Sequence, residues 1–450
     1  MAQYTPDWAE QISGVPADKI RSIAVELGTI KPGRIDYMRG AFMHYNGVQT
    51  VRAITLLEAL AGLGEAKGSQ GGRPRWDWGF PFPQPEEPPK SLNLFAGEQG
   101  SCLVPNPDVS HQVVHMLDKG EDKPEIYFVY CHNPVYSNGG CEENARVYKD
   151  EEKVPFLVAS DVVLSETSEL ADLVLPDATY LERYTLQGKT SADNVLEYYL
   201  RQPMHPPLGE ARNWIDVALE LANRIDLGLG FSTAEEFVRA TCENTPGVKE
   251  AGGFEYMKEH GIWHDRTATT SEFDQSPLTV KHDDLEAAGF GGMPTWTPIP
   301  GHHQMADNEL VLTTHKVAVQ SHSRTQGCKW LTELHHDNRA WINSRTAAEL
   351  GIIDGDMIRV TSEIGSIEIA AFVTEGVHLK AIAISHHCGH WAWGQYASGK
   401  KSVNHVADAD TENKWWKSNG AHVNLIIPPK GEPIGGGMCW MDTVVKVEKA

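Results

Sequence analysis

Three nearly uninterrupted apolar runs, separated by segments long enough for helices, constrain the fold of this chain most. The runs are Glu125–Tyr130, Val154–Ser160 and Ala171–Pro176, and Glu142–Tyr148 between the first two is typical of a helix. Strands that are apolar along their whole length, instead of at alternate positions, are typical of parallel sheets covered on both faces. The pattern therefore predicts a parallel α/β domain.

Polar side chains follow the ends of these expected strands. Asn133 and Ser137 come after the first strand, and Asp161 comes at the end of the second. Ligands of open parallel sheets bind beyond the carboxyl ends of the strands, so these residues place an amide, a hydroxyl and a carboxylate in one crevice. A carboxylate there accepts hydrogen bonds from a guanine or a ribose; the alternative is an ordinary turn with a side-chain cap. Spacing alone leaves both open.

From about Asn308 the chain changes to short strands and tight turns, which predicts a closed or nearly closed β-barrel with inserted helices. The expected strands are Glu309–Thr314, Met357–Thr361, Ser366–Val373 and Ala381–Ser385. A helix is expected over Thr346–Leu350, with Ser344 as its N-cap and Gly351 just past its end.

The segments before the barrel are less regular. Apolar spacing predicts helices over Asp18–Leu27 and Val51–Leu63. Gly68–Pro89 is rich in Gly and Pro and is expected to be a long irregular loop, and such loops are disproportionately functional. Gly228–Pro300 is polar and is expected to be a connecting region with one or two helices.

Two barrel segments concentrate polar side chains. Thr313–Lys316 and Gln320–Thr325 bracket one turn and carry hydroxyl, imidazole, amide and cationic donors, which suit an anionic phosphate as well as they suit a solvated loop. In Ser385–Trp391, an extended strand would place His386, Cys388 and His390 on one face. Those three residues are either a zinc site or a turn of ligand-facing or core-packed histidines.

Arg73 and Arg75 lie in the Gly-rich loop. Guanidinium groups in such a loop can clamp an oxyanion through two hydrogen bonds each, although exposed arginines are also common without any function. Both interpretations stay open.

Composition excludes several classes of function. With 39 Lys+Arg against 61 Asp+Glu the formal charge is −22, so the surface repels phosphate backbones and no nucleic-acid partner is expected. No Walker A loop, G-x-S-x-G elbow or strand-following G-x-G-x-x-G occurs. The seven cysteines include no C-x-x-C pair, which argues against a local iron–sulfur cluster.

No signal peptide or membrane-spanning segment is expected from this sequence, because it contains no apolar window of about 18 residues and no basic start followed by an apolar run. The compartment stays open. A periplasmic location and membrane association through partner subunits both remain alternatives.

Seven segments, in this order along the chain, resemble the molybdopterin-dependent oxidoreductases of the dimethyl sulfoxide reductase type. They are Tyr4–Ala24, Asn46–Gly68, Ile126–Asn138, Val158–Arg183, Leu200–Ile225, Trp341–Val377 and Ile434–Ala450. The phrases TYLERY, LRQPMHPPLGEAR and IGGGMCWMDT look most like the polysulfide and thiosulfate reductase branch.

The resemblance implies an α/β fold in which a Rossmann-like parallel domain precedes a C-terminal barrel of the double-psi type. Residues 1–95 correspond to the end of the third family domain with its active-site loop, and residues 96–230 to the second half of the dinucleotide-binding domain. Residues 231–307 connect these to the molybdopterin dinucleotide-binding barrel, residues 308–450. The chain is thus expected to be the C-terminal part of a catalytic subunit.

The implied cofactor is molybdenum, or tungsten, bound as bis-molybdopterin guanine dinucleotide (bis-MGD). The expected partners are an N-terminal portion, which carries a [4Fe–4S] cluster and the protein ligand of the metal, an iron–sulfur electron-transfer subunit, and a small oxyanion or sulfur substrate. The implied reaction is oxidation or reduction of polysulfide, thiosulfate or tetrathionate in anaerobic respiration, with no activity without the N-terminal portion. The alternatives are a non-catalytic cofactor-binding module and a family enzyme acting on another oxyanion or formate.

The resemblance also assigns roles to individual residues. Arg73 or Arg75 falls near the loop that supplies a substrate-facing arginine in some members. No metal ligand is expected from this chain. The positions that match family contacts to the cofactor are Asn133, Ser137, Asp161, Asp177, Thr314, His315, Lys316, Gln320, Ser321, His322, His386, His387, Asn419, Gly420 and Asn424.

Overall fold

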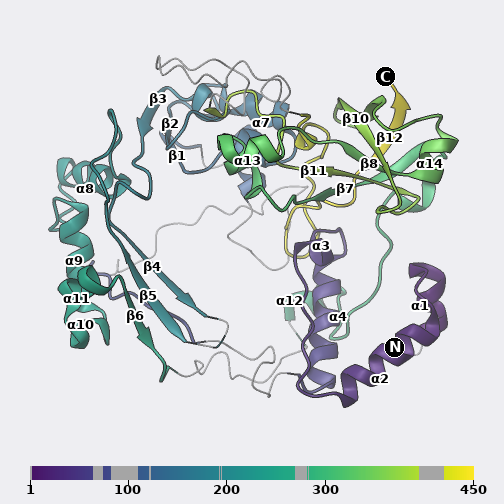
Figure 1. The fold of residues 1–450 in the computed structure, drawn as a ribbon, viewed down its shortest axis with the longest axis horizontal. Helices are drawn as coiled ribbons and strands as arrows, with labels where there is room; N and C mark the ends of the chain where they lie inside the picture. Colours follow the sequence, from purple (N-terminus) through teal and green to yellow (C-terminus); the bar gives the residue numbers. More distant parts are fainter. Residues whose placement is uncertain are drawn as a thin grey trace.

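The structure is a computed structural model that describes residues 3–63, 74–82, 110–120, 123–191, 193, 195–268, 281, 283–394 and 420–450. Four groups of elements make it up (Figure 1): a set of N-terminal helices, a three-stranded parallel sheet, a three-stranded antiparallel sheet with its helices, and a closed barrel. The barrel lies on the right of Figure 1 and the antiparallel sheet on the left.

The N-terminal helices confirm both predicted segments. They are α1 (Pro6–Ser13), α2 (Ala17–Thr29), α3 (Arg39–Phe42) and α4 (Gly47–Leu60). Helix α4 begins four residues earlier than predicted, because Gly47 allows the start of α4 to pack onto the end of α3. A Cβ at Gly47 would lie 1.9 Å from the Phe42 carbonyl oxygen, so no other residue fits there.

The parallel α/β unit also confirms its prediction. Its strands are β1 (Tyr127–Tyr130), β2 (Leu157–Asp161) and β3 (Leu173–Pro176), and its helices are α5 (Val113–Lys119), α6 (Pro134–Ser137) and α7 (Cys141–Tyr148). Val129, Val147 and Leu157 are buried between the strands and the helices. The burial of β2 explains its continuous apolar sequence, whereas β1 and β3 leave Phe128 and Leu173 partly exposed.

The antiparallel sheet was not predicted. Its strands are β4 (Thr185–Thr190), β5 (Leu196–Arg201) and β6 (Ile262–Asp265), and helices α8 (Trp214–Arg224), α9 (Ala234–Asn244), α10 (Val248–Ala251) and α11 (Gly253–His260) accompany it. The expectation of only one or two helices in Gly228–Pro300 is therefore wrong. Strand β6 pairs with β5 across more than 60 residues of chain, so no local pattern announces it.

The barrel confirms the second predicted domain type. Six strands close in the order β10-β8-β11-β7-β12-β9. They are β7 (Glu309–His315), β8 (Ala340–Asn343), β9 (Met357–Thr361), β10 (Ser366–Thr374), β11 (Ala381–Ser385) and β12 (Val444–Lys449). Leu310, Leu312, Ile342, Ile358 and Ile382 fill its core with no exposed surface. Strands β8 and β12 were missed.

One predicted cap in the barrel is wrong. Helix α14 (Ser344–Glu349) is capped by Asn343, whose Oδ1 accepts a hydrogen bond from the Arg345 N–H at 3.0 Å. Ser344 is already the first helical residue. Both residue types are good caps, so sequence preference alone could not separate them.

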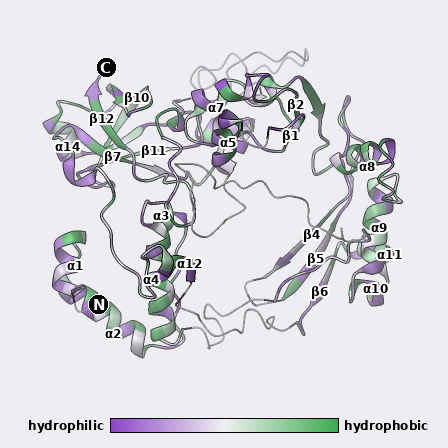
Figure 2. Cartoon of the chain, turned by 180° about the vertical axis from the view of Figure 1, so that it is seen from behind, coloured by the Kyte–Doolittle hydropathy of each residue, from purple (hydrophilic) through white to green (hydrophobic). Residues whose placement is uncertain are grey.

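Hydrophilic and hydrophobic stretches alternate along α8, α9 and α11 (Figure 2), whose buried faces carry Leu219, Phe237 and Met257, as expected of helices that pack one face and expose the other. Within the described part of the chain, no helix combines the length and the apolar character needed to cross a bilayer.

An ion pair joins the N-terminal helices to the barrel. His44 Nδ1 lies 2.5 Å from Asp442 Oδ1, and the Tyr45 N–H donates to Asp442 Oδ2 at 2.5 Å. The hydrogen bond to Asp442 raises the pKa of His44 above its ordinary value of 6.5. The pKa of His44 is therefore higher in the folded than in the unfolded protein. The ion pair stabilises the folded protein fully at a pH below the unfolded-state pKa of His44, and this stabilisation is lost as the pH rises through the folded-state pKa.

We therefore expect His44→Gln to destabilise the protein most at about pH 5.5 and hardly at all at about pH 9. Thermal unfolding of both proteins across this range checks the prediction. A difference in melting temperature that stays constant with pH would mean that the ion pair contributes nothing.

Candidate functional site

The strand ends of the parallel sheet bring two of the predicted aspartates together. Asp161 ends β2, and the Asp177 N–H donates to the Asp161 carbonyl at 3.0 Å. Burial raises the pKa of the Asp161 carboxyl. The fully buried Asp177 carboxylate already accepts from the Tyr130 hydroxyl and the Trp214 N–H, both at 3.1 Å, and pairs with Arg183. Asp177 is thus bonded internally.

Asn133, just before α6, is also bonded internally. Its Oδ1 accepts from the Thr167 N–H at 3.0 Å and the Thr167 hydroxyl at 2.8 Å, and its Nδ2 donates to Glu166 Oε2 at 2.7 Å. The side chain uses both ends of its amide to join two loops. The Asn133 side chain therefore holds the strand-end loops together and has its hydrogen bonds within the protein instead of with a ligand.

Ser137 and Asn424 meet where the α/β unit contacts the barrel. Asn424 Nδ2 donates to the carbonyls of Tyr136 at 3.0 Å and Ser137 at 3.1 Å. Ser137 Oγ and Asn424 Oδ1 are buried and have no hydrogen-bond partner in the protein. Buried polar atoms rarely stay unpaired, so these two atoms are candidates for ligand contacts.

The barrel contributes a cluster of histidines, because two of its strands run in the same direction. Strands β7 and β11 pair in parallel with Ser385 opposite His315, so His315 and His386 emerge at the same end of the barrel. His322 Nδ1 lies 3.3 Å from His386 Nε2, and the His387 ring stacks on that of His386 with 4.4 Å between centroids. The structure thus brings four predicted residues together.

These imidazoles are uncharged near neutral pH. Burial, followed by His322 and Lys316, lowers the pKa of His386 to about 4. Burial, followed by His386, lowers the pKa of His387 to about 3, and burial also lowers the pKa values of His315 and His322. His315 Nδ1, His386 Nδ1 and both ring nitrogens of His387 are buried without a partner.

The other predicted residues of this loop are bonded or exposed. Thr325 Oγ1 donates to Gln320 Oε1 at 2.7 Å and accepts from the Ser321 N–H at 2.8 Å. The Thr314 N–H contacts the Met441 sulfur at 3.3 Å, and Lys316 is exposed beside the histidines. Among the predicted residues of this loop, Lys316 therefore supplies a positive charge that solvent can reach.

Gly420 is held against the same end of the barrel. Its φ is +73°, and a Cβ there would lie 2.3 Å from Asn338 Oδ1 and 2.9 Å from the Cβ of Cys388. Asn338 itself joins the end of β11 to the Gly420 segment, since Asn338 Nδ2 donates to the carbonyls of Ser385 and Ala421, both at 2.9 Å. Only glycine allows this approach.

We expect Gly420→Ala to lower the free energy of unfolding by about 1–3 kcal/mol, because it combines an unfavourable φ with a steric conflict. The matched control is Gly28→Ala in α2, where nothing lies within 4 Å of the added Cβ. Denaturant titration compares the two. Equal stability of both variants would refute the close packing around Gly420.

The remaining predicted residues do not join these groups. Arg73 and Asn419 lie outside the described residues. Arg75 is exposed in a segment beside β4, where Thr190 Oγ1 donates to the Pro74 carbonyl at 2.5 Å. Strand β4 and the barrel lie on opposite sides of Figure 1, so the structure does not bring Arg75 to the histidines.

The zinc alternative finds no support in the described residues, among which no group of three or more His, Cys, Asp or Glu could hold a metal ion. His386 faces His322, Cys388 Sγ lies 3.8 Å from Gln326 Oε1, and His390 bonds elsewhere. The segment turns instead of extending, with Gly389 at φ +84°, so the three side chains do not share a face.

Sequence reasoning missed Glu166 and considered His390 only as part of a zinc site or a histidine turn, whereas the two form a buried ion pair between the two units. His390 Nδ1 donates to Glu166 Oε1 at 3.0 Å, and neither side chain is more than 1% exposed. Burial would raise the pKa of Glu166, but the bonds from His390 and Asn133 hold it at about 2. Only the position of Glu166 beyond the end of β2 hinted at a role.

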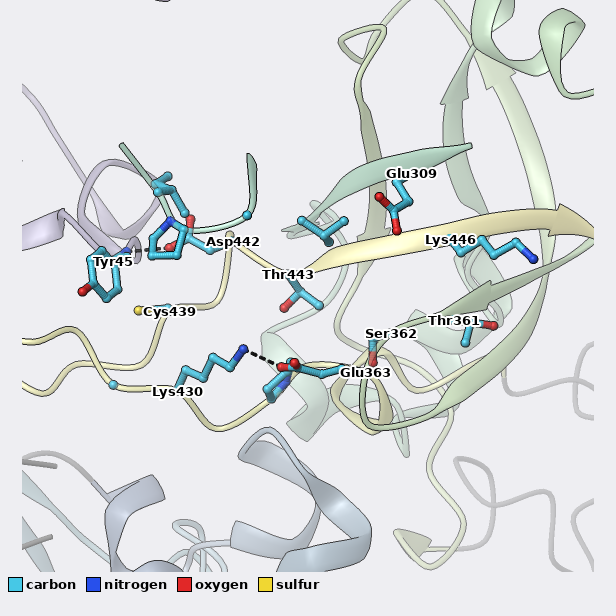
Figure 3. Close-up of a pocket in the computed structure, with 16 residues that line it drawn as sticks. Tyr45, Glu309, Thr361, Ser362, Glu363, Lys430, Cys439, Asp442, Thr443 and Lys446 are labelled. Carbon is cyan, nitrogen blue, oxygen red and sulfur yellow. Dashed lines mark hydrogen bonds and ion pairs between the residues drawn. The ribbon is translucent and has the colours of Figure 1, made fainter. Parts of the chain in front are cut away.

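A cavity of about 790 Å³ lies elsewhere among the described residues (Figure 3). None of the predicted site residues lines it. Its charged side chains are largely paired within the protein, as with Lys430 and Glu363 at 2.5 Å, and Asp442 bonds the Tyr45 N–H. The volume of this cavity would make it a candidate ligand site. The buried polar atoms without a partner instead indicate the histidine end of the barrel, and we give more weight to these atoms because a ligand could satisfy them.

The residues at the histidine end fit a large anionic ligand with polar ring edges. The buried polar atoms without a partner at this end and at the adjoining junction include Ser137 Oγ, His315 Nδ1, Ser385 Oγ, His386 Nδ1, both ring nitrogens of His387 and Asn424 Oδ1. They come from both the α/β unit and the barrel. Fixed groups of this kind replace water around phosphates and heterocyclic rings.

Two family models match this chain. Molybdopterin oxidoreductase matches residues 31–224, and the molydopterin dinucleotide binding domain matches residues 310–443. The second match covers most of the barrel and the histidine cluster.

Similar proteins include dimethyl sulfoxide reductase DmsA of Escherichia coli (strain K12), 25% identical over 465 residues, covering 94% of this chain and 56% of that protein. A sulfite dehydrogenase chain of Allochromatium vinosum is 23% identical over 604 residues, covering 100% of this chain and 61% of that protein. The chain thus spans little more than half of these curated relatives. The solved structure of acetylene hydratase from Pelobacter acetylenicus shares the fold, with a TM-score of 0.71, 16% identity and coverage of 100% of this chain and 65% of that one.

Proposed function

Because this chain belongs to the dimethyl sulfoxide reductase family of molybdopterin oxidoreductases, we propose that it is the cofactor-holding C-terminal part of a molybdenum or tungsten bis-MGD enzyme. Its length relative to DmsA and the sulfite dehydrogenase supports a catalytic subunit with a further portion. That portion would carry the [4Fe–4S] cluster and the protein ligand of the metal, and activity would require it. An iron–sulfur electron-transfer subunit would complete the complex.

The single observation that carries this proposal is the set of buried, unpaired polar atoms shared by two units. Ser137 and Asn424 would contact the guanine dinucleotide at the junction, and His386 and His387 would contact the pterin side. As uncharged imidazoles, the histidines can donate or accept hydrogen bonds without fixing a positive charge near the metal. When bound, the cofactor supplies two-electron redox and atom-transfer chemistry.

We propose a sulfur compound, such as polysulfide, thiosulfate or tetrathionate, as the substrate. The similarity to a dimethyl sulfoxide reductase and a sulfite dehydrogenase supports this class. A selenate reductase of Mesobacillus selenatarsenatis, 23% identical, and a formate dehydrogenase of Methanocaldococcus jannaschii, 25% identical, keep another oxyanion and formate as the alternative. A non-catalytic binding module is the alternative of a different class.

The test is to purify the chain alone and together with the remaining portion of its catalytic subunit, from cells that make the cofactor. We expect molybdenum or tungsten, and two guanines per chain, in the complex. A complex without either metal and without guanine would contradict the proposal, and guanine without turnover of any of these substrates would favour the non-catalytic module. Stoichiometric zinc in the isolated chain would instead support the zinc alternative.

A further inference from the structure

The ion pair between Glu166 and His390 joins elements that are far apart in the sequence. Glu166 lies in the loop that follows β2 of the α/β unit, and His390 lies in the loop that follows β11 of the barrel. The Glu166 carboxylate also accepts from the N–H groups of Trp391 at 2.9 Å and Ala392 at 3.1 Å, and from Asn133 Nδ2. One carboxylate thus holds the barrel loop and the strand-end loop together.

The hydrogen bonds of His390 fix the position of its ring. Its Nδ1 faces the ionised carboxylate of Glu166, and its Nε2 lies 3.1 Å from the Ser323 carbonyl oxygen. Both partners are hydrogen-bond acceptors, so the His390 ring faces an acceptor on each of its two nitrogens. The ring is thereby held between the Glu166 carboxylate and the Ser323 carbonyl deep inside the protein.

Aromatic stacking strengthens the same contact. The Tyr136 ring lies between the rings of His390, at 3.7 Å and 8°, and His422, at 3.6 Å and 16°. The Tyr136 hydroxyl donates to the Cys388 carbonyl at 2.6 Å, and His422 Nε2 donates to the Tyr136 carbonyl at 2.8 Å. Stacking of rings at these separations is favourable beyond the area that it buries. Tyr136 from the α/β unit is thus held on both faces by the barrel.

We propose that Glu166 and His390 are positioning residues that fix the distance between the two halves of the cofactor site; this inference rests on the proposed function. His386 and His387 lie in the same loop as His390, and Ser137 follows directly on Tyr136. A displacement of His390 from Glu166 therefore separates the pterin-side imidazoles of the barrel from Ser137 of the α/β unit. The ion pair touches no unpaired atom of the site and acts through these neighbours.

The test uses the complex with the remaining portion of the catalytic subunit. The variants are Glu166→Gln, which removes the charge, Glu166→Asp, which keeps it with a shorter side chain, and Glu142→Gln, an exposed control in α7. Guanine that remains bound is measured over time after dilution. We expect Glu166→Gln to lose guanine about 10- to 100-fold faster than wild type, as is typical when a residue that orients binding groups is changed. Glu166→Asp should be intermediate and Glu142→Gln unchanged.

Amide hydrogen exchange separates positioning from general destabilisation. In Glu166→Gln we expect faster exchange in residues 386–392 and 133–138 and unchanged exchange in β9 and β10. Equal guanine loss in Glu166→Gln and wild type would overturn the inference. If Glu166→Gln is insoluble, Glu166→Asp decides, and wild-type behaviour of that variant overturns it. Wild-type protein that contains no guanine would instead refute the proposed function.

Discussion

Replacing Asp177 by alanine is expected to lower the free energy of unfolding of the α/β unit by about 3–5 kcal/mol, the usual cost of removing one partner of a buried ion pair. The Asp177 side chain has no exposed surface, and that of Arg183 is 15% exposed. The substitution leaves the guanidinium without its counter-charge and removes the acceptor of the Tyr130 hydroxyl and the Trp214 N–H. Denaturant unfolding, followed by circular dichroism, measures the loss.

The matched control is Glu220→Ala. Glu220 pairs with Arg212 and Arg224 on the surface, where ion pairs contribute little, so stability should hardly change. A similar, small effect of both substitutions would contradict the structural role of Asp177. The role predicted from the family resemblance, a direct cofactor contact, would then regain support.

Replacing His387 by leucine is expected to stabilise the cofactor-free chain by about 1 kcal/mol, while guanine retention falls about tenfold. His387 has no exposed surface, and neither of its ring nitrogens has a partner in the protein. A leucine of similar volume removes the cost of those buried polar atoms. It also removes the hydrogen bonds that a ligand would receive, so stability and binding should change in opposite directions.

Thermal unfolding of the cofactor-free chain and guanine analysis of the complex measure the two effects. His378→Leu is the control, because His378 is exposed before the start of β11, at the opposite end of that strand from His387. Loss of both stability and guanine in His387→Leu would show that His387 serves packing only. Unchanged guanine retention would remove His387 from the site.

The parallel sheet and four barrel strands could be predicted because their signals are local. Continuous apolar runs identified β1, β2 and β3, and turn spacing identified β9 and β11 to the residue. The β4–β5–β6 sheet escaped because β4 is largely polar and because β6 pairs with β5 across more than 60 residues of chain. Gly188 in β4 even weakens the strand signal, although its missing side chain is what allows Trp76 to cover the sheet.

Part of the candidate site could be predicted because it depends on strands whose sequence signals are local. Strand direction alone places His315 and His386 at one end of the barrel, and Asn133 and Asp161 at one edge of the sheet. The partners of those residues were not predictable. Glu166 and His390 are 224 positions apart, and only the folded chain shows that Asn133 bonds Glu166 instead of facing a ligand.

The central claim is that the unpaired polar atoms at the histidine end of the barrel and at the junction with the α/β unit hold the cofactor. The most direct measurement is a crystal structure of the complex with its cofactor bound. We predict guanine dinucleotide or pterin atoms within hydrogen-bond distance of Ser137, Asn424 and His387. A cofactor located away from all three, for example in the cavity beside Lys430, would contradict it.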